Sequence, residues 1–186
     1  MGEEFTKVRF TNFDKIIFPQ KKIEKKQLIE SCIKITQSKL SLYLLKRNFN
    51  ITKEPKSNKK TKKGSIFVVQ KHHSKRLHFD LRLEKDGVLK SWAVPKGIPL
   101  ETNKKKLAIE VEDHPIDYSK FEGTIPKGQY GAGTVEIWDK GVFETKNWEK
   151  DLIAFFPKGQ KMIGKYILVR LKKDKGKNWL LFKGRD

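Results

Sequence analysis

Apolar and polar residues alternate strictly along residues 77–83, which is the pattern of a half-buried β-strand. One side of this strand is apolar and must pack on a core; it consists of Leu77, Phe79, Leu81 and Leu83. The other side presents an imidazole, a carboxylate and a guanidinium, from His78, Asp80 and Arg82, spaced about 7 Å apart at the rise of a strand. This polar row makes the strand the first candidate for chemistry.

Similar strand patterns recur up to the end of the chain, separated by turn signals. We predict strands at residues 65–70, 77–84, 88–94, 106–111, 134–138, 142–145, 165–171 and 178–183. Hairpin turns are predicted at residues 85–87, at residues 139–141 and around Lys175 and Gly176. Residues 148–156 favour a short helix. Together these elements predict a mainly β fold, a small antiparallel β-barrel with few short helices.

Residues 1–64 differ in composition from residues 65–186, so we expect a basic, helical N-terminal extension with a linker, followed by the barrel domain. Apolar residues at helical spacing predict an amphipathic helix or two within residues 25–46. Residues 52–64 have no apolar side chain and are interpreted as a solvated linker or a nucleic-acid-binding arm. We expect the extension to add affinity for nucleic acid without chemistry. The alternative is that its apolar residues, Leu40 among them, pack on the barrel.

The charge of the chain points to a polyanionic partner. It has 42 basic and 22 acidic residues among 186, a net charge of +20. Nucleic acid is therefore the first expected partner. A membrane is not expected, because no apolar stretch of about 20 residues and no signal peptide is present. The single Cys32 excludes an internal disulfide, which favours an intracellular protein. We expect it in the cytoplasm, associated with the nucleoid. A lysine-rich surface without functional meaning is the alternative.

Histidines are concentrated near the polar strand face. Three of the four lie within residues 72–78, and His72, His78 and Asp80 form a set of two nitrogens and one oxygen. Three protein ligands leave positions open for water and substrate, as a catalytic metal needs, and this set suits manganese, iron or zinc. The alternative is that His78 and Asp80 are surface residues whose spacing is due to chance.

His114 and Arg82 are the candidates for contact with a phosphate. His114 follows Glu112 and Asp113 and precedes a proline, which gives its imidazole a defined direction. Near a metal-bound phosphate it could donate a proton or stabilise charge. Guanidinium is the group of choice for phosphate oxygens, and Arg82 shares a strand face with Asp80. The alternatives are an incidental histidine in a solvated turn and a structural Arg82–Asp80 salt bridge.

Residues 125–134 are rich in glycine. They lack the Gly-Lys-Ser/Thr of a P-loop, and strands follow them in place of the helix of a dinucleotide fingerprint. We therefore predict tight turns and a close backbone approach, in preference to a phosphate cradle.

Six motifs follow one another in a fixed order beyond Ser65. They are Phe67-Val-Val-Gln-Lys-His72, Leu77-His-Phe-Asp-Leu-Arg-Leu83, Ser91-Trp-Ala-Val-Pro-Lys-Gly97, Val111-Glu-Asp-His-Pro115, Phe121-Glu-Gly-Thr-Ile-Pro126, and Gly128-Gln-Tyr-Gly-Ala-Gly133 with Trp138-Asp-Lys-Gly141. Together they resemble the 3′-phosphoesterase domain of bacterial DNA ligase D, the end-joining ligase. The resemblance covers about residues 65–186.

The resemblance implies a small β-barrel that uses manganese to remove a 3′-terminal ribonucleoside and then the 3′-phosphate, leaving a 3′-hydroxyl. It implies His72, His78 and Asp80 as metal ligands, with Arg82 and His114 as the catalytic pair that contacts the phosphate. It also implies polar residues that support the site: Gln70, Ser91, Lys96, Lys106, Glu112, Asp113 and Tyr118. Lys106 stands where the family usually has arginine, which keeps the charge but loses a bidentate grip.

The implied substrates are the 3′ ends of DNA or RNA-tailed DNA. The implied partners are a separate DNA ligase, a polymerase and a Ku-type end-binding protein. Residues 8–19, followed by residues 25–29, resemble the opening of the polymerase domain of the same ligases, but the polymerase's catalytic carboxylate region has no counterpart. We interpret residues 1–50 as a vestige or docking element without polymerase activity.

Two other functions stay open on the residues alone. Two histidines and a carboxylate also suit a non-haem iron oxygenase, which would depend on dioxygen. A basic barrel could also bind nucleic acid without catalysis, and it would then turn over no 3′ end.

Overall fold

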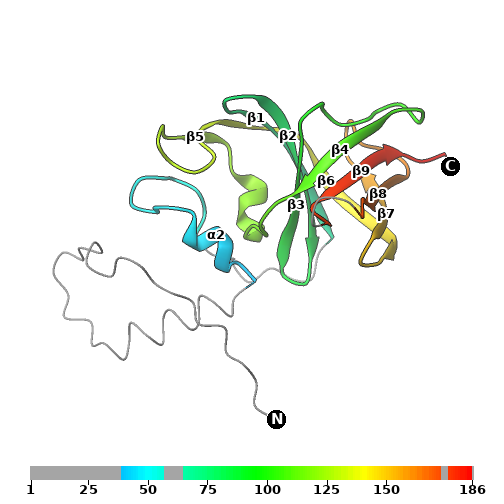
Figure 1. The fold of residues 1–186 in the computed structure, drawn as a ribbon, viewed down its shortest axis with the longest axis horizontal. Coiled ribbons are helices and arrows are strands. Elements are labelled where there is room, and N and C mark those ends of the chain that lie inside the picture. The colour runs from blue at the N-terminus through cyan, green and yellow to red at the C-terminus, as the bar shows by residue number, and fades with distance from the viewer. Residues whose placement is uncertain (1–38, 57–64, 173–175, 186) are drawn as a thin grey trace, which may run out of the picture. The chain divides into compact units, whose positions relative to one another are not determined.

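In residues 39–56, 65–172 and 176–185, the part that this computed structural model describes, nine antiparallel strands form one sheet. They are β1 (Ile66–His73), β2 (Leu77–Lys85), β3 (Val88–Val94), β4 (Lys105–Glu110), β5 (Gly123–Ile125), β6 (Gly133–Trp148), β7 (Leu152–Lys158), β8 (Tyr166–Arg170) and β9 (Asn178–Lys183). Their order is β1-β2-β3-β4-β9-β8-β7-β6-β5, and β1 also pairs with β6 (Figure 1). Eight strands therefore close into a barrel, with β5 outside the ring on β6. The predicted antiparallel barrel is confirmed.

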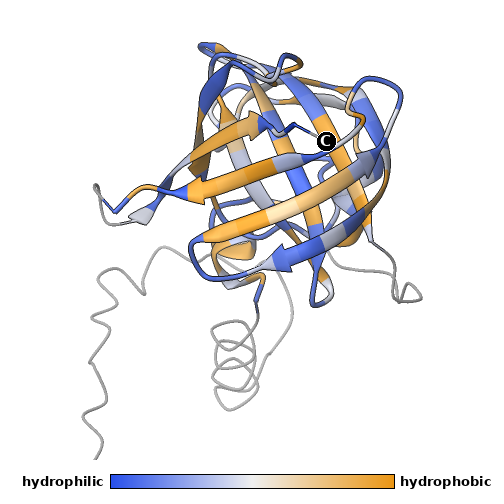
Figure 2. Cartoon of the chain, turned by 90° about the vertical axis from the view of Figure 1, so that its right-hand side faces the viewer, coloured by the Kyte–Doolittle hydropathy of each residue, from blue (hydrophilic) through white to orange (hydrophobic). Residues whose placement is uncertain are grey.

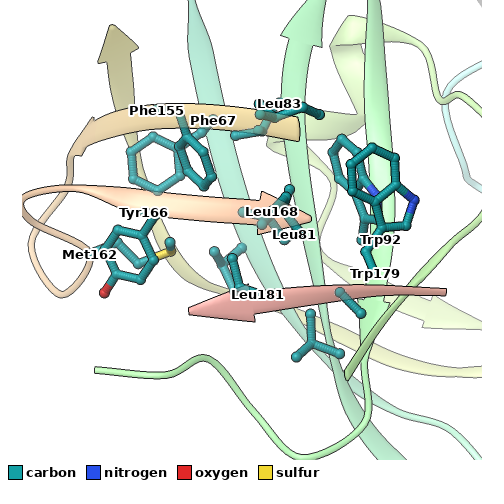
Figure 3. Packing of buried hydrophobic residues seen from close by; sticks show 14 of the residues in the cluster. Phe67, Leu81, Leu83, Trp92, Phe155, Met162, Tyr166, Leu168, Trp179 and Leu181 are labelled. Atoms are coloured by element: carbon teal, nitrogen blue, oxygen red, sulfur yellow. The ribbon is translucent and has the colours of Figure 1, made fainter. Parts of the chain in front are cut away.

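Alternate side chains of the strands fill the barrel interior. Figure 2 shows long hydrophobic stretches on several strands, with hydrophilic residues toward their ends and in the turns. Leu81 and Leu83 of β2 are fully buried there, as the alternation predicts, whereas Leu77 at the start of the strand is exposed. Aromatic pairs fill much of the space in Figure 3: the rings of Trp92 and Trp179 meet edge to face with their centroids 5.8 Å apart. Burying such side chains contributes about 1.5–3 kcal/mol each.

The hairpin predicted at residues 139–141 is wrong, because β6 continues through it. The Asp139 carboxylate is buried and accepts hydrogen bonds from four backbone N–H groups, those of Lys140, Gln160, Lys161 and Met162. Gly141 serves a close approach of strands, since a β-carbon there would lie 2.3 Å from the carbonyl oxygen of Lys158. A bulge opposite Val69 and Gln70 bends β6 and lets it pair with β1 by its first half and β7 by its second.

The short helix predicted at residues 148–156 is wrong too, because strand β7 begins at Leu152. Ile153 and Phe155 both point into the barrel core, which is the two-residue period of a strand. The other two predicted hairpins are confirmed as the β2–β3 and β8–β9 pairs. Asp86 and Gly87 both have positive φ, 53° and 81°, as a two-residue Asp-Gly turn needs.

A second apolar cluster is separate from the barrel core. It is supplied by the helix α2 (Ser41–Leu45), the 3₁₀ helix η2 (Ile116–Lys120) and the strands β3, β5 and β6, through Tyr43, Leu89, Tyr118, Phe121, Ile125 and Val135. Tyr43 is fully buried and its hydroxyl donates to the carbonyl of Pro55. Leu40 is buried as well, so residues 39–56 pack against the barrel.

The described residues all belong to one compact unit by their contacts. A domain boundary at residue 64 stays a prediction. Most of the predicted helical stretch, residues 25–38, and the lysine-rich residues 57–64 lie outside the described part of the chain. No helix within the described residues is long and apolar enough to cross a membrane.

Replacing Asp139 with Asn should lower the free energy of unfolding by about 2–4 kcal/mol, because the amide nitrogen would face backbone N–H donors where an acceptor now stands. Urea denaturation followed by circular dichroism measures this. Glu144→Gln on the same strand is the matched control: Glu144 is exposed and pairs with Lys158, so little change in the free energy of unfolding is expected. A loss no larger than that of the control would show that Asp139 does not hold the β7–β8 loop.

Candidate active site and metal centre

The pairing of β1 with β2 brings together the three residues predicted as metal ligands. His72 lies directly opposite His78, and Asp80 follows two residues later on the same face. One ligand atom from each lies within 4.8 Å of the others. His72 Nδ1 is 3.7 Å from Asp80 Oδ2, and His78 Nε2 is 3.7 Å from Asp80 Oδ1. This outer face of the barrel therefore carries a compact set of two nitrogens and a carboxylate.

The hydrogen bonds of both imidazoles fit metal binding. His72 Nε2 is 2.9 Å from the carbonyl oxygen of Gly131 and must donate to it, which leaves Nδ1 free as an acceptor. His78 Nδ1 donates in the same way to the carbonyl of Arg76, at 2.9 Å, which leaves Nε2 free. The two free nitrogens are the atoms that face Asp80, so backbone carbonyls select the tautomers that a divalent metal requires.

Asp80 stays ionised although it is buried. Burial raises the pKa of its carboxyl, but the Arg82 guanidinium and the two imidazoles outweigh that effect, so its pKa lies below the ordinary value. A charged carboxylate beside two imidazole nitrogens is a donor set for manganese, iron or zinc.

Arg82 is held rigidly behind the metal set. Its Nε donates to Gln70 Oε1 at 2.8 Å, Nη1 to Ser91 Oγ at 3.0 Å and Nη2 to Asp80 Oδ2 at 3.1 Å. Gln70 is fixed in turn by donating to the carbonyls of Tyr118 and Phe121. Guanidinium has five N–H donors, so two remain for a ligand. The salt bridge to Asp80 and a phosphate-binding role are thus compatible.

His114 lies on the same pocket, in a strand-like bridge to Leu89. Its Nδ1 donates to the carbonyl of Glu112 at 2.8 Å, and its Nε2, 3.1 Å from Arg47 Nη2, accepts from that guanidinium. Burial, together with the positive charges of Arg82 and Arg47, holds the pKa of His114 well below its ordinary value. The imidazole is therefore neutral, with an unprotonated Nε2 facing the pocket.

Arg47 is a site residue that sequence reasoning missed. It projects from residues 39–56 into the pocket, where Nε donates to Glu54 at 2.8 Å and Nη1 to Glu112 at 3.0 Å. Tyr43 packs under its guanidinium, 3.9 Å from the ring centroid. Our expectation that residues 1–64 add affinity without chemistry stays a prediction, but one of their side chains lines the site.

The interpretation of residues 52–64 as a solvated linker is wrong at its start. Thr52 and Glu54 are buried, and their side chains hydrogen bond to each other at 2.9 Å. Glu54 also accepts from the hydroxyl of Tyr118, at 3.0 Å. A hydrophobicity pattern cannot reveal the contact between Glu54 and Tyr118, because it joins polar groups that lie far apart in the sequence.

These residues surround one pocket of about 250 Å³. Its polar and charged lining consists of Arg47, His72, Ser74, His78, Asp80, Arg82, Glu112, His114, Tyr118 and Tyr130. Gln70 and Ser91 stand behind Arg82, and Asp113 pairs with Lys90 at 2.7 Å. Lys96 is exposed and Lys106 lies on β4 opposite Leu181; both are outside the lining.

The glycine-rich stretch behaves as predicted. Gly131 and Gly133 both have positive φ, and a β-carbon on Gly133 would lie 2.3 Å from the carbonyl oxygen of His73. The loop therefore approaches β1 closely, and this approach delivers the Gly131 carbonyl to His72.

Comparison with known proteins agrees with these features. Residues 70–170 match the family described as the DNA ligase D 3′-phosphoesterase domain. The chain is 46% identical over 157 residues to the multifunctional non-homologous end joining protein LigD of Pseudomonas aeruginosa, covering 79% of the chain and 19% of that protein. It is 45% identical over 161 residues to LigD of Mycolicibacterium smegmatis, covering 80% and 21%. The chain spans about a fifth of the length of these relatives. The polymerase-like character of residues 8–29 stays a prediction.

The pKa of His114 gives stability a specific dependence on pH. In the unfolded chain the His114 imidazole takes up a proton below about pH 6.5, whereas in the folded protein the buried imidazole does not. The free energy of unfolding should therefore fall by up to about 1.4 kcal/mol for each pH unit below that value. Urea denaturation between pH 5 and pH 8 measures this slope. His114→Asn, whose amide can still donate to the Glu112 carbonyl, should have a shallower slope. The exposed His73→Asn is the control, and equal slopes in all three proteins would contradict a neutral His114.

Proposed function

Because this chain belongs to the DNA ligase D 3′-phosphoesterase domain family, we propose that it is a manganese-dependent phosphoesterase that processes the 3′ ends of DNA for end joining and repair. It removes a 3′-terminal ribonucleoside from RNA-tailed DNA and hydrolyses the 3′-phosphate to a 3′-hydroxyl. The observation that carries the proposal is the pocket itself, in which a metal-ligating set, two buried guanidiniums and a neutral imidazole converge.

His72, His78 and Asp80 would hold the metal. When bound, it supplies a Lewis acid for a phosphate oxygen and lowers the pKa of a coordinated water. The carbonyls of Gly131 and Arg76 orient the two imidazoles toward it. Manganese is favoured over iron and zinc by the family resemblance, since the donor set suits all three.

Arg82 and Arg47 would bind the phosphate. Each guanidinium is anchored by carboxylates and side-chain oxygens on one side, so its orientation is set before substrate arrives. Two donors of Arg82 remain for non-bridging oxygens. Preorganised donors of this kind stabilise the charge that develops in the transition state without reorganising.

His114 would act on the leaving oxygen. In the substrate-free protein its Nε2 carries no proton, so it must acquire one before it can donate. In the phosphatase step, the phosphate monoester has a second pKa near 6 and can bring that proton as the monoanion. The negative charge of the ester also offsets the two guanidiniums, which raises the affinity of Nε2 for the proton. His114 then returns the proton to the leaving group.

The rival functions have less support from the pocket. Two buried guanidiniums beside the metal set suit a phosphate group, and the family that the chain matches is described as a phosphoesterase domain. We propose a DNA ligase, a polymerase and a Ku-type end-binding protein as partners at the nucleoid, because the names of the relatives describe multifunctional non-homologous end joining.

The proposal predicts manganese-dependent turnover of two substrates. A primer–template that ends in one ribonucleotide should be shortened to a 3′-phosphate and then to a 3′-hydroxyl, and a primer with a 3′-phosphate should give the 3′-hydroxyl. Chelation or His78→Ala should abolish both reactions, as resolved on a denaturing gel. His73→Ala is the matched control, because His73 is exposed beside the site and should be dispensable. Turnover that persists in His78→Ala would contradict the metal assignment.

Replacing His114 with Ala should lower the phosphatase kcat by about 10²–10⁴-fold, the usual contribution of a general acid or electrostatic group. Manganese affinity, measured by electron paramagnetic resonance titration, should be retained because His114 is outside the ligand set. Unchanged turnover in a folded His114→Ala protein would remove it from the mechanism.

A further inference from the structure

The pocket leaves the nucleoside of the substrate without a described site. Its volume of about 250 Å³ and its charged lining suit a metal and a phosphate group. On the proposed function, on which this inference rests, the phosphate is attached to the sugar of a terminal nucleotide. That nucleotide must therefore lie at the rim, where its base would need an aromatic or apolar surface.

Tyr130 provides such a surface. In the described part of the chain it is the one aromatic residue among the exposed large hydrophobic side chains, with 47% of its surface exposed. It also lines the pocket that holds the metal set. An exposed aromatic ring at the rim of a basic pocket is the arrangement by which proteins bind single-stranded nucleic acid, because bases of every kind have a π face to stack.

The ring is fixed in position. Lys46 Nζ donates to the Tyr130 hydroxyl at 3.1 Å, lies 4.4 Å from the ring centroid and pairs with Glu112 at 2.9 Å. The next residue, Gly131, accepts from the metal-site His72 and has a φ of 76°. Because these contacts already hold the Tyr130 ring in place, little conformational entropy is lost when a base stacks on it.

A second pocket, next to the first, could accommodate the rest of the DNA strand. It has a volume of about 430 Å³, lies between the β1–β2 turn and the glycine-rich loop, and shares Ser74 and Gly131 with the pocket. Its rim includes the exposed Lys75, a cation that can neutralise a backbone phosphate. The DNA strand can thus pass from the first pocket over the glycine-rich loop that lines the second.

We propose that Tyr130 is the stacking subsite for the base of the nucleotide that carries the reacting phosphate, without preference among the bases. Stacking on one aromatic ring contributes about 1–3 kcal/mol, which corresponds to about a 5- to 150-fold change in KM.

The test compares two primers, each ending in a 3′-phosphate, of which one has a normal terminal base and the other an abasic terminal sugar. Tyr130→Ala should raise KM on the normal primer by about 5- to 150-fold and leave kcat within about twofold. On the abasic primer, the wild-type protein should already have the raised KM, and Tyr130→Ala should raise it no further. Tyr130→Phe keeps the ring, loses the hydrogen bond from Lys46 and should behave as wild type on both.

If Tyr130→Ala raises KM equally on the two primers, Tyr130 acts by holding the loop. If it leaves KM on the normal primer unchanged, Tyr130 does not contact the base. Either result overturns the proposal. A second readout does not need turnover. The fluorescence of a primer with a terminal 2-aminopurine should be quenched when the primer binds the wild-type protein or Tyr130→Phe. It should be quenched far less when the primer binds Tyr130→Ala. If the wild-type protein hydrolyses no 3′-phosphate, the proposed function fails, and the quenching alone decides on the stacking subsite.

Discussion

The register between β1 and β2 places His72 opposite His78 and Gln70 opposite Asp80. Side chains alternate along a strand, so a slip by one residue would turn these polar groups into the barrel and expose its core. What sets the register is the apolar face of the same two strands, on which Phe67, Val69, Leu81 and Leu83 are buried. The hydrophobic energy of the core therefore determines the geometry of the candidate metal site on the opposite face.

The second constraint is the burial of charge around that site. Arg82, Asp80, Glu54 and Glu112 are all buried, and each has an ionic or hydrogen-bonded partner. Removing one partner of a buried ion pair typically costs about 3–5 kcal/mol, because the other charge is left uncompensated. Arg47 pairs with two of these carboxylates, so residues 39–56 complete the charge balance of the pocket as well as covering the barrel. The same positive charge keeps His114 neutral until an anion enters.

Local alternation predicted most strands of the barrel and the polar face of β2, but it gave a helix in place of β7 and missed β5. The order of motifs pointed to five residues that converge there, His72, His78, Asp80, Arg82 and His114. The errors share one cause, since each involves partners distant in sequence. Asp139 and Gly141 have the composition of a turn, but β7 and the β7–β8 loop use them for backbone contacts. Arg47 and Glu54 have the composition of a solvated surface, but Glu112 and Tyr118, more than 60 residues away, pair with them inside the pocket. Periodicity reports the face of an element and does not report which distant element will cover it.

The most direct measurement of the central claim is an anomalous difference map from a crystal of the protein soaked in manganese and recorded at the manganese absorption edge. The account predicts one strong peak within about 2.5 Å of His72 Nδ1, His78 Nε2 and an Asp80 oxygen. A peak that leaves out any of the three, or manganese bound elsewhere while this site stays vacant, would contradict it.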